Sequence, residues 1–231
     1  MKRIAMLILI GLLICSASLA NGKKRKGGRG GGSGVPKVVD QLPLQEVDQT
    51  EAADLVYLRE GEKVARDVYM VLWAEWGLKV FDNIEDSEQI HMDAVGTLLT
   101  RHKIEDPVGD NGVGVFTDKD LQDLYYSLLA KGLLSRDDAI IVGATVEDKS
   151  IHDLQEMLER TDNKDLKIVY QNLLRGSRNH LRAFYRQLTK YDLTFTPSYI
   201  TQAEYDAVVS TPAERGPMNR DGRVGVPGSR S

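Results

Sequence analysis

Apolar residues recur at intervals of three and four positions along four long stretches of this chain, which is typical of amphipathic helices. These stretches predict helices over Thr50–Trp76, Asn83–Lys103, Ser135–Arg160 and Lys164–Lys190. The first and third helices begin with a Thr or Ser that can act as an N-cap. No stretch alternates apolar and polar residues as a half-buried strand does, so the sequence predicts an all-α fold.

The connections between the predicted helices indicate how the helices are arranged. Short segments separate the first helix from the second and the third from the fourth, so each pair is expected to form an antiparallel hairpin. About 30 residues separate the second helix from the third, and they comprise a loop, Asp106–Phe116, and a short helix that Asp118 caps and that extends through Lys131. A crossover of this length can return along the bundle and make those two helices parallel. Two antiparallel hairpins joined by one long crossover define the ferritin-like four-helix bundle.

The first 20 residues, Met1–Ala20, have a basic start, an apolar stretch and small residues near their end. This pattern is typical of a secretory signal peptide, with cleavage expected after Ala20, and lipid attachment at Cys15 is the alternative. The apolar stretch is short for a permanent membrane helix, so no transmembrane span is expected in the mature chain. Cleavage would remove the only Cys, which favours an oxidising compartment and therefore a secreted or periplasmic protein.

Charge is distributed unevenly and separates the ends of the chain from its middle. Residues 21–37 are basic and rich in Gly, and residues 214–231 are rich in Gly, Arg and Pro, so both segments are predicted to be disordered. The N-terminal segment is interpreted as a solvated linker, with weak contact to anionic surfaces as the alternative. The remaining domain, 38–213, has 18 basic and 32 acidic residues. Such a domain is poorly suited to nucleic acid and better suited to cations.

Each of the four apolar stripes is interrupted by polar residues at a similar level of the predicted bundle. In chain order, the interrupting residues are Glu62, Glu88 and His91, Glu147, and Ser177 and His180. A carboxylate is costly to bury unless it is paired or bound to a metal. Three carboxylates at one level would repel one another, and a divalent cation removes that conflict.

The spacing of these residues supports a metal site. Glu88 and His91 form a Glu-x-x-His pair, which places both side chains on one face of a helical turn. The segment 91–95 aligns with 180–184, and each segment's His follows a Glu on the preceding helix, by 29 and 33 positions. The chain therefore resembles two related hairpins, and carboxylate-bridged dinuclear sites have this pattern. The repeat deviates at Ser177, where a second Glu-x-x-His would have its Glu.

Several blocks between Leu55 and Leu188 resemble the DUF2202 family, an uncharacterised family of the ferritin-like superfamily. The blocks are Glu62–Tyr69, Ser87–Val95, Asp106-Pro107, Val142–Glu147 and Gly176–Phe184. The resemblance implies the ferritin-like fold and the binding of iron or manganese between the helices, but no particular reaction. The residues that match ligand positions of the superfamily are Glu62, Glu88, His91, Glu147 and His180. At the position of Ser177 the superfamily often has a bridging carboxylate.

The sequence therefore predicts a secreted protein that binds one or two Fe or Mn ions in the core of a bundle, with Zn as an alternative. If the metal is iron, a ferroxidase-like or peroxide-consuming activity is expected, although the pattern assigns no catalytic residue. The alternative is a redox-silent structural or binding module that holds a structural ion or none. Tyr69 is interpreted as core packing, with a proton-donating or radical-quenching phenol as the alternative. His102 and His152 are expected to lie outside the site.

Overall fold

The computed structural model describes residues 39–223 of the chain, and the regular elements in this part are helices. The four long helices are α3 (Gln49–Trp76), α4 (Lys79–Arg101), α6 (Arg136–Arg160) and α7 (Lys164–Lys190). The prediction of an all-α protein is confirmed for these residues. The predicted bounds of the fourth helix agree with α7, and Ser135 is the N-cap of α6, as predicted.

The first predicted helix begins at a different cap from the one expected. The N-cap of α3 is Asp48, not Thr50, because Asp48 and Glu51 form a capping box. The Asp48 carboxylate accepts from the Glu51 backbone N–H at 2.8 Å, and the Glu51 carboxylate accepts from the Asp48 N–H at 3.0 Å. This reciprocal pair satisfies two backbone donors that would otherwise lack partners.

The bounds predicted for the second helix are also corrected. Gly77 ends α3 in the left-handed conformation, with φ of 64°, and α4 starts directly afterwards at Lys79 rather than at Asn83. Val80 and Phe81 are buried, so the first turn of α4 belongs to the core. The helix ends at Arg101 rather than at Lys103, since Lys103 has a positive φ of 57° that no α-helix contains.

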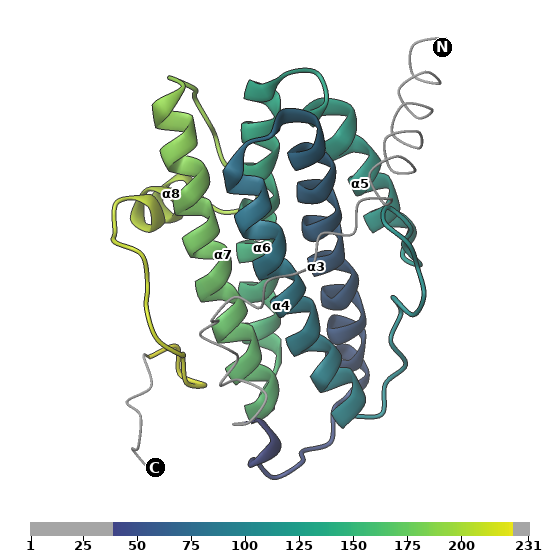
Figure 1. The fold of residues 1–231 in the computed structure, drawn as a ribbon. Helices are drawn as coiled ribbons and strands as arrows, with labels where there is room; N and C mark the ends of the chain where they lie inside the picture. Colours follow the sequence, from purple (N-terminus) through teal and green to yellow (C-terminus); the bar gives the residue numbers. More distant parts are fainter. Residues whose placement is uncertain (1–38, 224–231) are drawn as a thin grey trace.

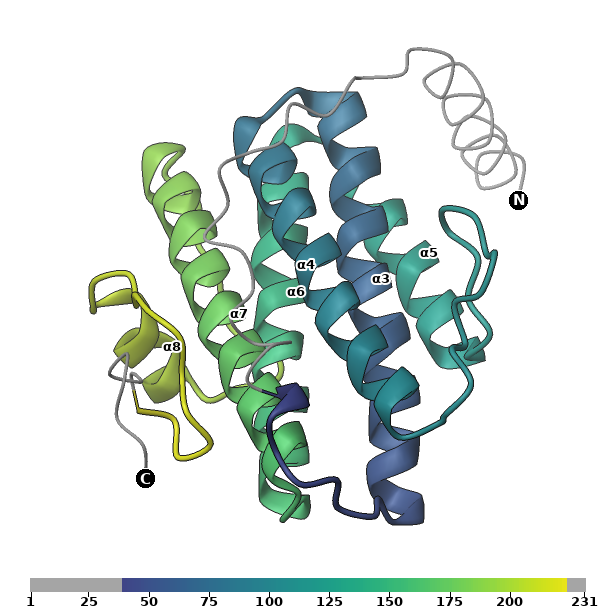
Figure 2. The same cartoon turned by 60° about the horizontal axis from the view of Figure 1, so that its bottom comes forward.

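The four long helices lie side by side as two hairpins (Figure 1). α3 packs mainly on α4, and α6 packs mainly on α7. A crossover follows α4, contains the short helix α5 (Lys119–Gly132) with Asp118 as its N-cap, and covers the outer side of α3 and α6 (Figure 2). Because the crossover returns the chain to the end where α4 began, α4 and α6 run in the same direction.

Aromatic side chains fill the core where the two hairpins meet. The rings of Tyr69, Phe81 and Phe184 are 5.5 to 5.8 Å apart between centroids, and all are fully buried. Phe184 lies directly against Gly143, where a Cβ would be only 2.2 Å from the ring. Gly143 therefore allows α6 and α7 to approach closely at this level.

Buried polar residues on the outer side of α3 hold the crossover in place. The Glu60 carboxylate accepts from the backbone N–H groups of Thr117 and Asp118, at 2.6 and 2.8 Å, just before α5 begins. Lys63 is fully buried, pairs with Asp67 at 2.6 Å and donates to the carbonyl of Gly112 at 2.7 Å. These contacts give the buried charges on this side of α3 a structural role.

A further short helix, α8 (Gln202–Val209), follows α7 and was not predicted. Its N-cap is Thr201, which forms a capping box with Glu204. The sequence Thr201-Gln-Ala-Glu204 is the usual signature of such a helix start, so the signal was present in the sequence.

The structure describes the first part of the predicted tail 214–231, up to Arg223, and this part contacts α7. Glu214 pairs with Arg178 and Arg182 of α7, at 2.6 and 3.0 Å. Met218 is buried, and its backbone exchanges two hydrogen bonds of 2.9 Å with the side chain of Asn172. A segment without an apolar stripe can thus be held by polar contacts to a neighbouring helix, which periodicity does not indicate.

Among residues 39–223, no helix is both long enough and apolar enough to cross a membrane. The predicted signal peptide, Met1–Ala20, and the basic segment 21–37 lie outside the described residues, as do residues 224–231.

Candidate metal centre

The five residues singled out as ligands lie together in the middle of the bundle, each on one of the four long helices. Glu62 is on α3, Glu88 and His91 are on α4, Glu147 is on α6 and His180 is on α7. All five are buried, and none is more than 8% exposed. The apolar spacing that places each helix against its neighbours therefore also turns these polar side chains inward.

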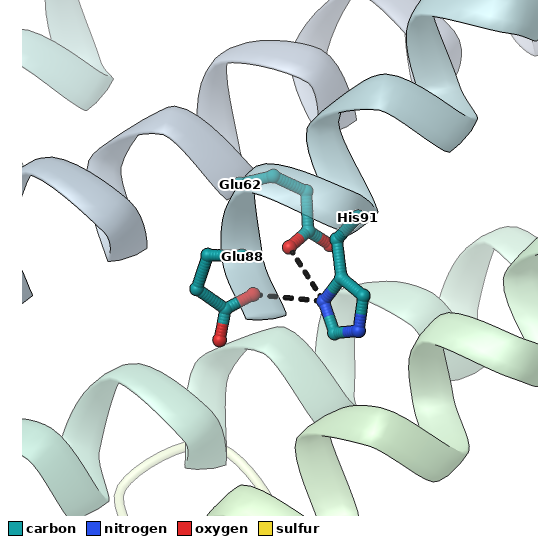
Figure 3. A group of neighbouring side chains, drawn as sticks. All are labelled: Glu62, Glu88 and His91. Carbon is teal, nitrogen blue, oxygen red and sulfur yellow. Dashed lines mark hydrogen bonds and ion pairs between the residues drawn. The ribbon is translucent and has the colours of Figure 1, made fainter. Parts of the chain in front are cut away.

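The five side chains form two groups that share Glu88. In the first group, His91 Nδ1 lies 3.2 Å from Glu62 Oε2 and 2.7 Å from Glu88 Oε2 (Figure 3). In the second group, His180 Nδ1 lies 2.8 Å from Glu88 Oε1 and 3.5 Å from Glu147 Oε2. Each carboxylate oxygen of Glu88 therefore faces a different histidine, and the imidazole rings stack with centroids 5.4 Å apart.

Hydrogen bonds alone do not satisfy this cluster. Each Nδ1 has one proton or one lone pair, but two carboxylate oxygens lie within 3.5 Å of it. Glu62 Oε1 is buried without a hydrogen-bond partner, and Glu88 Oε1 and His180 Nδ1 lie 2.8 Å apart as an ion pair without good hydrogen-bond geometry. Most buried polar atoms in proteins have a well-formed hydrogen bond, so these exceptions in one cluster point to an additional group between them.

The donor set fits a divalent transition-metal ion. Metal–oxygen and metal–nitrogen bonds are about 2.1 Å, so neighbouring ligand atoms on one ion are roughly 3 Å apart. The observed separations of 2.7 to 3.5 Å agree with this value. Within each group, Glu62, Glu88 and His91 or Glu88, Glu147 and His180, the ligand atoms all lie within 4.8 Å of one another.

Burial and mutual charge shift the acidities of these groups strongly. Burial raises the pKa of Glu62 to about 7, although His91 lowers it. Burial also raises the pKa of Glu147. Burial disfavours the charged form of Glu88, but His180 and His91 outweigh this and hold its pKa below the usual range. Burial lowers the pKa of His180, but Glu88 and Glu147 more than offset this and raise it to about 9. The histidines therefore carry protons that a metal ion would have to displace.

Residues outside the two groups fix the orientation of the presumed ligands. The hydroxyl of Tyr69 donates to Glu147 Oε1 at 2.5 Å and also lies 3.3 Å from the carbonyl of Gly143. Tyr69 thus has a polar partner in the site as well as the core packing predicted for it. His180 Nε2 lies 2.9 Å from the hydroxyl of Ser87 on α4.

His91 has a different outer neighbour. A Cβ built on Gly176 of α7 would lie 2.5 Å from His91 Nε2, so the absence of a side chain there makes room for the ring. In the internal repeat, Gly176 is the counterpart of Ser87, since each residue comes four positions before a histidine. Aligning the two repeats would have drawn attention to both residues, but only the packing of α4 against α7 reveals what each contacts.

The acidic residues next to the candidates have other partners. Glu60 and Asp67 hold the crossover, and Arg66 pairs with Asp67 at 2.7 Å. Asp148 accepts from three consecutive backbone N–H groups, those of residues 198 to 200.

The two other histidines also lie outside the site. His102 Nε2 lies 2.9 Å from Asp165 Oδ2, and the ring of His152 lies beside the ring of Tyr199.

The fold and the site thus define the class of protein: a helical bundle with a buried cluster of carboxylates and imidazoles. The chain belongs to the DUF2202 family, described as an uncharacterized protein domain, which matches residues 51–212. This range contains all five residues of the cluster.

The chain is also similar to a protein of Methanocaldococcus jannaschii. The chain is 48% identical, over 182 residues, to the uncharacterized protein MJ0754 of Methanocaldococcus jannaschii, a match that covers 79% of this chain and 98% of that protein. The crystal structure of the hypothetical protein MJ0754 from Methanococcus jannaschii DSM 2661 resembles this structure with a TM-score of 0.74 and 47% identity. That likeness covers 75% of this chain and 99% of the other.

Proposed function

We propose that this protein is a ferritin-like four-helix bundle that binds one or two divalent transition-metal ions between its helices. The proposed ligands are Glu62, Glu88, His91, Glu147 and His180. The observation that carries the proposal is the position of Glu88, whose two oxygens lie 2.7 and 2.8 Å from the Nδ1 atoms of two different histidines. A carboxylate shared in this way is suited to bridge two ions.

The arrangement of the helices supports the ferritin-like assignment. The chain forms two hairpins, α3 with α4 and α6 with α7, and a crossover that contains α5 joins them. Bundles with one such crossover place their ligands on facing helices, with Glu-x-x-His on one helix and a Glu on its neighbour. Here Glu88 and His91 provide the pair, and Glu62 provides the neighbouring carboxylate.

Iron or manganese is the metal we propose, with zinc as the alternative. Three carboxylates and two imidazoles form an oxygen-rich set, which suits Fe and Mn better than the sulfur-rich sets that zinc often has in structural sites. Bound iron would supply one-electron chemistry toward oxygen or peroxide, which is the basis for proposing a ferroxidase-like or peroxide-consuming activity.

The side chains around the site would support that chemistry by positioning and by excluding water. Burial of all five presumed ligands keeps bulk water away from the reacting position. The hydroxyl oxygen of Tyr69 lies 2.5 Å from Glu147 Oε1 and donates a hydrogen bond to it, which fixes the direction of that carboxylate. Ser87 fixes the outer nitrogen of His180, so that Nδ1 faces the carboxylates.

The alternative function is a redox-silent structural or binding module, and one observation favours it. The raised pKa values of His91 and His180 mean that two imidazolium groups can balance most of the negative charge of three carboxylates. The bundle can therefore form without metal, and metal would then be unnecessary for folding.

Metal content after purification separates the two functions. Protein supplied with Fe(II) or Mn(II) and then dialysed should retain one or two ions per chain by elemental analysis. His91→Ala and His180→Ala should each sharply reduce the metal content while their helix content, measured by circular dichroism, stays the same. His152→Ala is the matched control, because His152 lies outside the cluster. Wild-type protein without metal, or histidine variants with unchanged metal, would favour the structural module.

We also propose that the protein is secreted or periplasmic, on the basis of the predicted signal peptide. This segment, Met1–Ala20, lies outside the described residues, so the proposal rests on its sequence pattern alone. N-terminal sequencing of exported protein should give Asn21 as the first residue. A lipid-modified Cys15 at the N-terminus would replace this proposal with a membrane-anchored protein.

A further inference from the structure

Ser177 occupies the position that corresponds to Glu88 in the second hairpin. It lies three residues before His180 on α7, as Glu88 lies three residues before His91 on α4. Its side chain is buried, and a Cβ on the preceding residue, Gly176, would lie 2.5 Å from His91 Nε2. Ser177 therefore belongs to the face of α7 that carries His180 and meets α4.

The chemical difference between serine and glutamate at this position is specific. Serine Oγ replaces the Cγ of a glutamate, so the missing part is the carboxylate group itself. The hydroxyl of Ser177 has only a long contact of 3.3 Å, to the carbonyl of Leu173 one turn earlier in the same helix. A donor with such a weak partner is free to turn toward a ligand.

Charge indicates the kind of group that is missing. The cluster has three carboxylates, those of Glu62, Glu88 and Glu147, which carry three negative charges when ionised. Two divalent ions would carry four positive charges, so one positive charge would be left uncompensated inside the protein. An uncompensated buried charge is costly, and one monoanion removes it.

We propose that a small monocarboxylate of the size of formate binds beside Ser177 and completes the site opposite Glu88. Its two oxygens would take the place of the absent glutamate carboxylate, and the hydroxyl of Ser177 would donate a hydrogen bond to it. This inference rests on the proposed function, because the anion would be held by the metal ions that Glu88 and the other proposed ligands would bind. It identifies a small carboxylate as the class of external ligand that this site accepts.

The test uses Mn(II) as the metal probe and full-length protein in a buffer without carboxylates. Titration calorimetry would measure the affinity for Mn(II) in sodium formate and in sodium chloride at equal concentration. Formate should tighten Mn(II) binding by about 10- to 100-fold relative to chloride, the range over which neighbouring ligand groups change metal affinity. Chloride is the matched control, because it has the same charge but cannot join two ions through two oxygens.

Two variants at the same position sharpen the test. Ser177→Glu should bind Mn(II) tightly in chloride and should no longer respond to formate, because it supplies the carboxylate from the chain. Ser177→Ala should keep most of the response, because the ions rather than the hydroxyl hold the anion. If Ser177→Glu fails to fold, the comparison of formate with chloride in wild-type protein still tests whether a small carboxylate binds with the metal.

The outcomes separate this inference from the proposed function. Mn(II) binding to the wild type with equal affinity in formate and chloride would overturn the inference and leave the metal site intact. The inference would also be overturned if Ser177→Glu folds but binds Mn(II) no more tightly than wild type in chloride. Wild-type protein that binds no Mn(II) in either salt would overturn both.

Discussion

The two halves of the cluster contain similar ligands but differ in what surrounds them. His180 has the hydroxyl of Ser87 at 2.9 Å from its outer nitrogen, whereas the outer nitrogen of His91 faces Gly176, a residue without a side chain. Glu147 receives a hydrogen bond from Tyr69, whereas Glu62 Oε1 is buried without a hydrogen-bond partner. The half with His180 is thus held by neighbouring side chains, and the half with His91 is held mainly by close packing.

This comparison indicates that the two halves should differ in metal affinity. Groups that orient a ligand before the metal arrives reduce the cost of binding. Burial raises the pKa of a carboxyl in both halves, that of Glu62 to about 7 and that of Glu147 as well, so the expected difference rests on the orienting side chains rather than on proton displacement. We therefore expect the half with His180 to fill first and to release its ion last.

The largest expected effect comes from the residue that the two halves share. Glu88→Ala removes one oxygen ligand from each half and should abolish retention of both ions, whereas Glu62→Ala should cost only the ion near His91. Elemental analysis of dialysed protein would give the number of ions per chain for each variant. Equal loss in the two variants would mean that the halves are not independent and that Glu88 has no special position.

The next effect is the dependence of stability on pH in metal-free protein. Glu62 has a pKa of about 7 against an ordinary value of 4.5, and His180 has a pKa of about 9 against 6.5. A raised pKa means that the folded state holds the proton more tightly, so this stabilisation is complete below the ordinary value and is lost as the pH rises through the folded value. The lowered pKa of Glu88 acts in the opposite direction, but only below its ordinary value of 4.5.

The free energy of unfolding of metal-free protein should therefore fall between pH 5 and pH 9, by an amount on the order of a few kcal/mol. The melting temperature should fall with it. Bound metal replaces the displaced protons, so the increase in melting temperature caused by Mn(II) should grow over the same range. Calorimetric melting with and without Mn(II) would measure both. An increase that is independent of pH would show that these groups do not release protons when the metal binds.

A smaller effect is expected from filling the space beside His91. Gly176→Ala would place a methyl group 2.5 Å from His91 Nε2, and overpacking of this kind costs about 1–3 kcal/mol. The ion near His91 should be weakened, and the ion near His180 should be retained. Urea unfolding and metal analysis would measure the two consequences.

Gly61→Ala is the matched control for that variant. Gly61 also lies inside a long helix, α3, but a Cβ there would have no neighbour within 4 Å. Replacing a helical glycine by alanine in open space should stabilise the protein by up to about 1 kcal/mol. A destabilised Gly61→Ala together with an unaffected Gly176→Ala would contradict the steric explanation.

The smallest effect is expected from Ser87→Ala, which removes the partner of His180 Nε2 and leaves all five presumed ligands in place. Such partners typically change metal affinity by about tenfold or more, so we expect about tenfold weaker binding in the half with His180. Competition with a metal-binding dye would resolve the two affinities. A change confined to the half with His91 would contradict the pairing of Ser87 with His180.

Much of the fold follows from local patterns in the chain. The bounds of α7 and the caps of α5 and α6 were predicted from periodicity and from Asp118 and Ser135. The start of α3 was predicted two residues late, because Asp48 and Thr50 are both good caps and only the reciprocal contact with Glu51 distinguishes them. The ordered contacts of Glu214 and Met218 were missed, because single polar contacts to a distant helix leave no periodic signal.

The sequence by itself determined which residues meet at the candidate site. Helical periodicity and short hairpin connections place Glu62, Glu88, His91, Glu147 and His180 on inner faces at one level, and the structure brings these five together. Their role as ligands stays a prediction that metal analysis tests. Local geometry is sufficient for this step, because the spacing along a helix fixes the face on which each side chain lies.

Only the tertiary structure decided how those residues are shared and supported. Three features depend on how closely α4 approaches α7. They are the contact of Glu88 with two histidines, the contact of Ser87 with His180, and the close approach of Gly176 to His91. These helices are far apart in the sequence, and their approach is set by the packing of core side chains such as Phe81 of α4 against Phe184 of α7, whose ring centroids are 5.6 Å apart. Periodicity determines which face of a helix is buried, whereas the identity of each side chain's neighbour depends on the shape of every group packed around it.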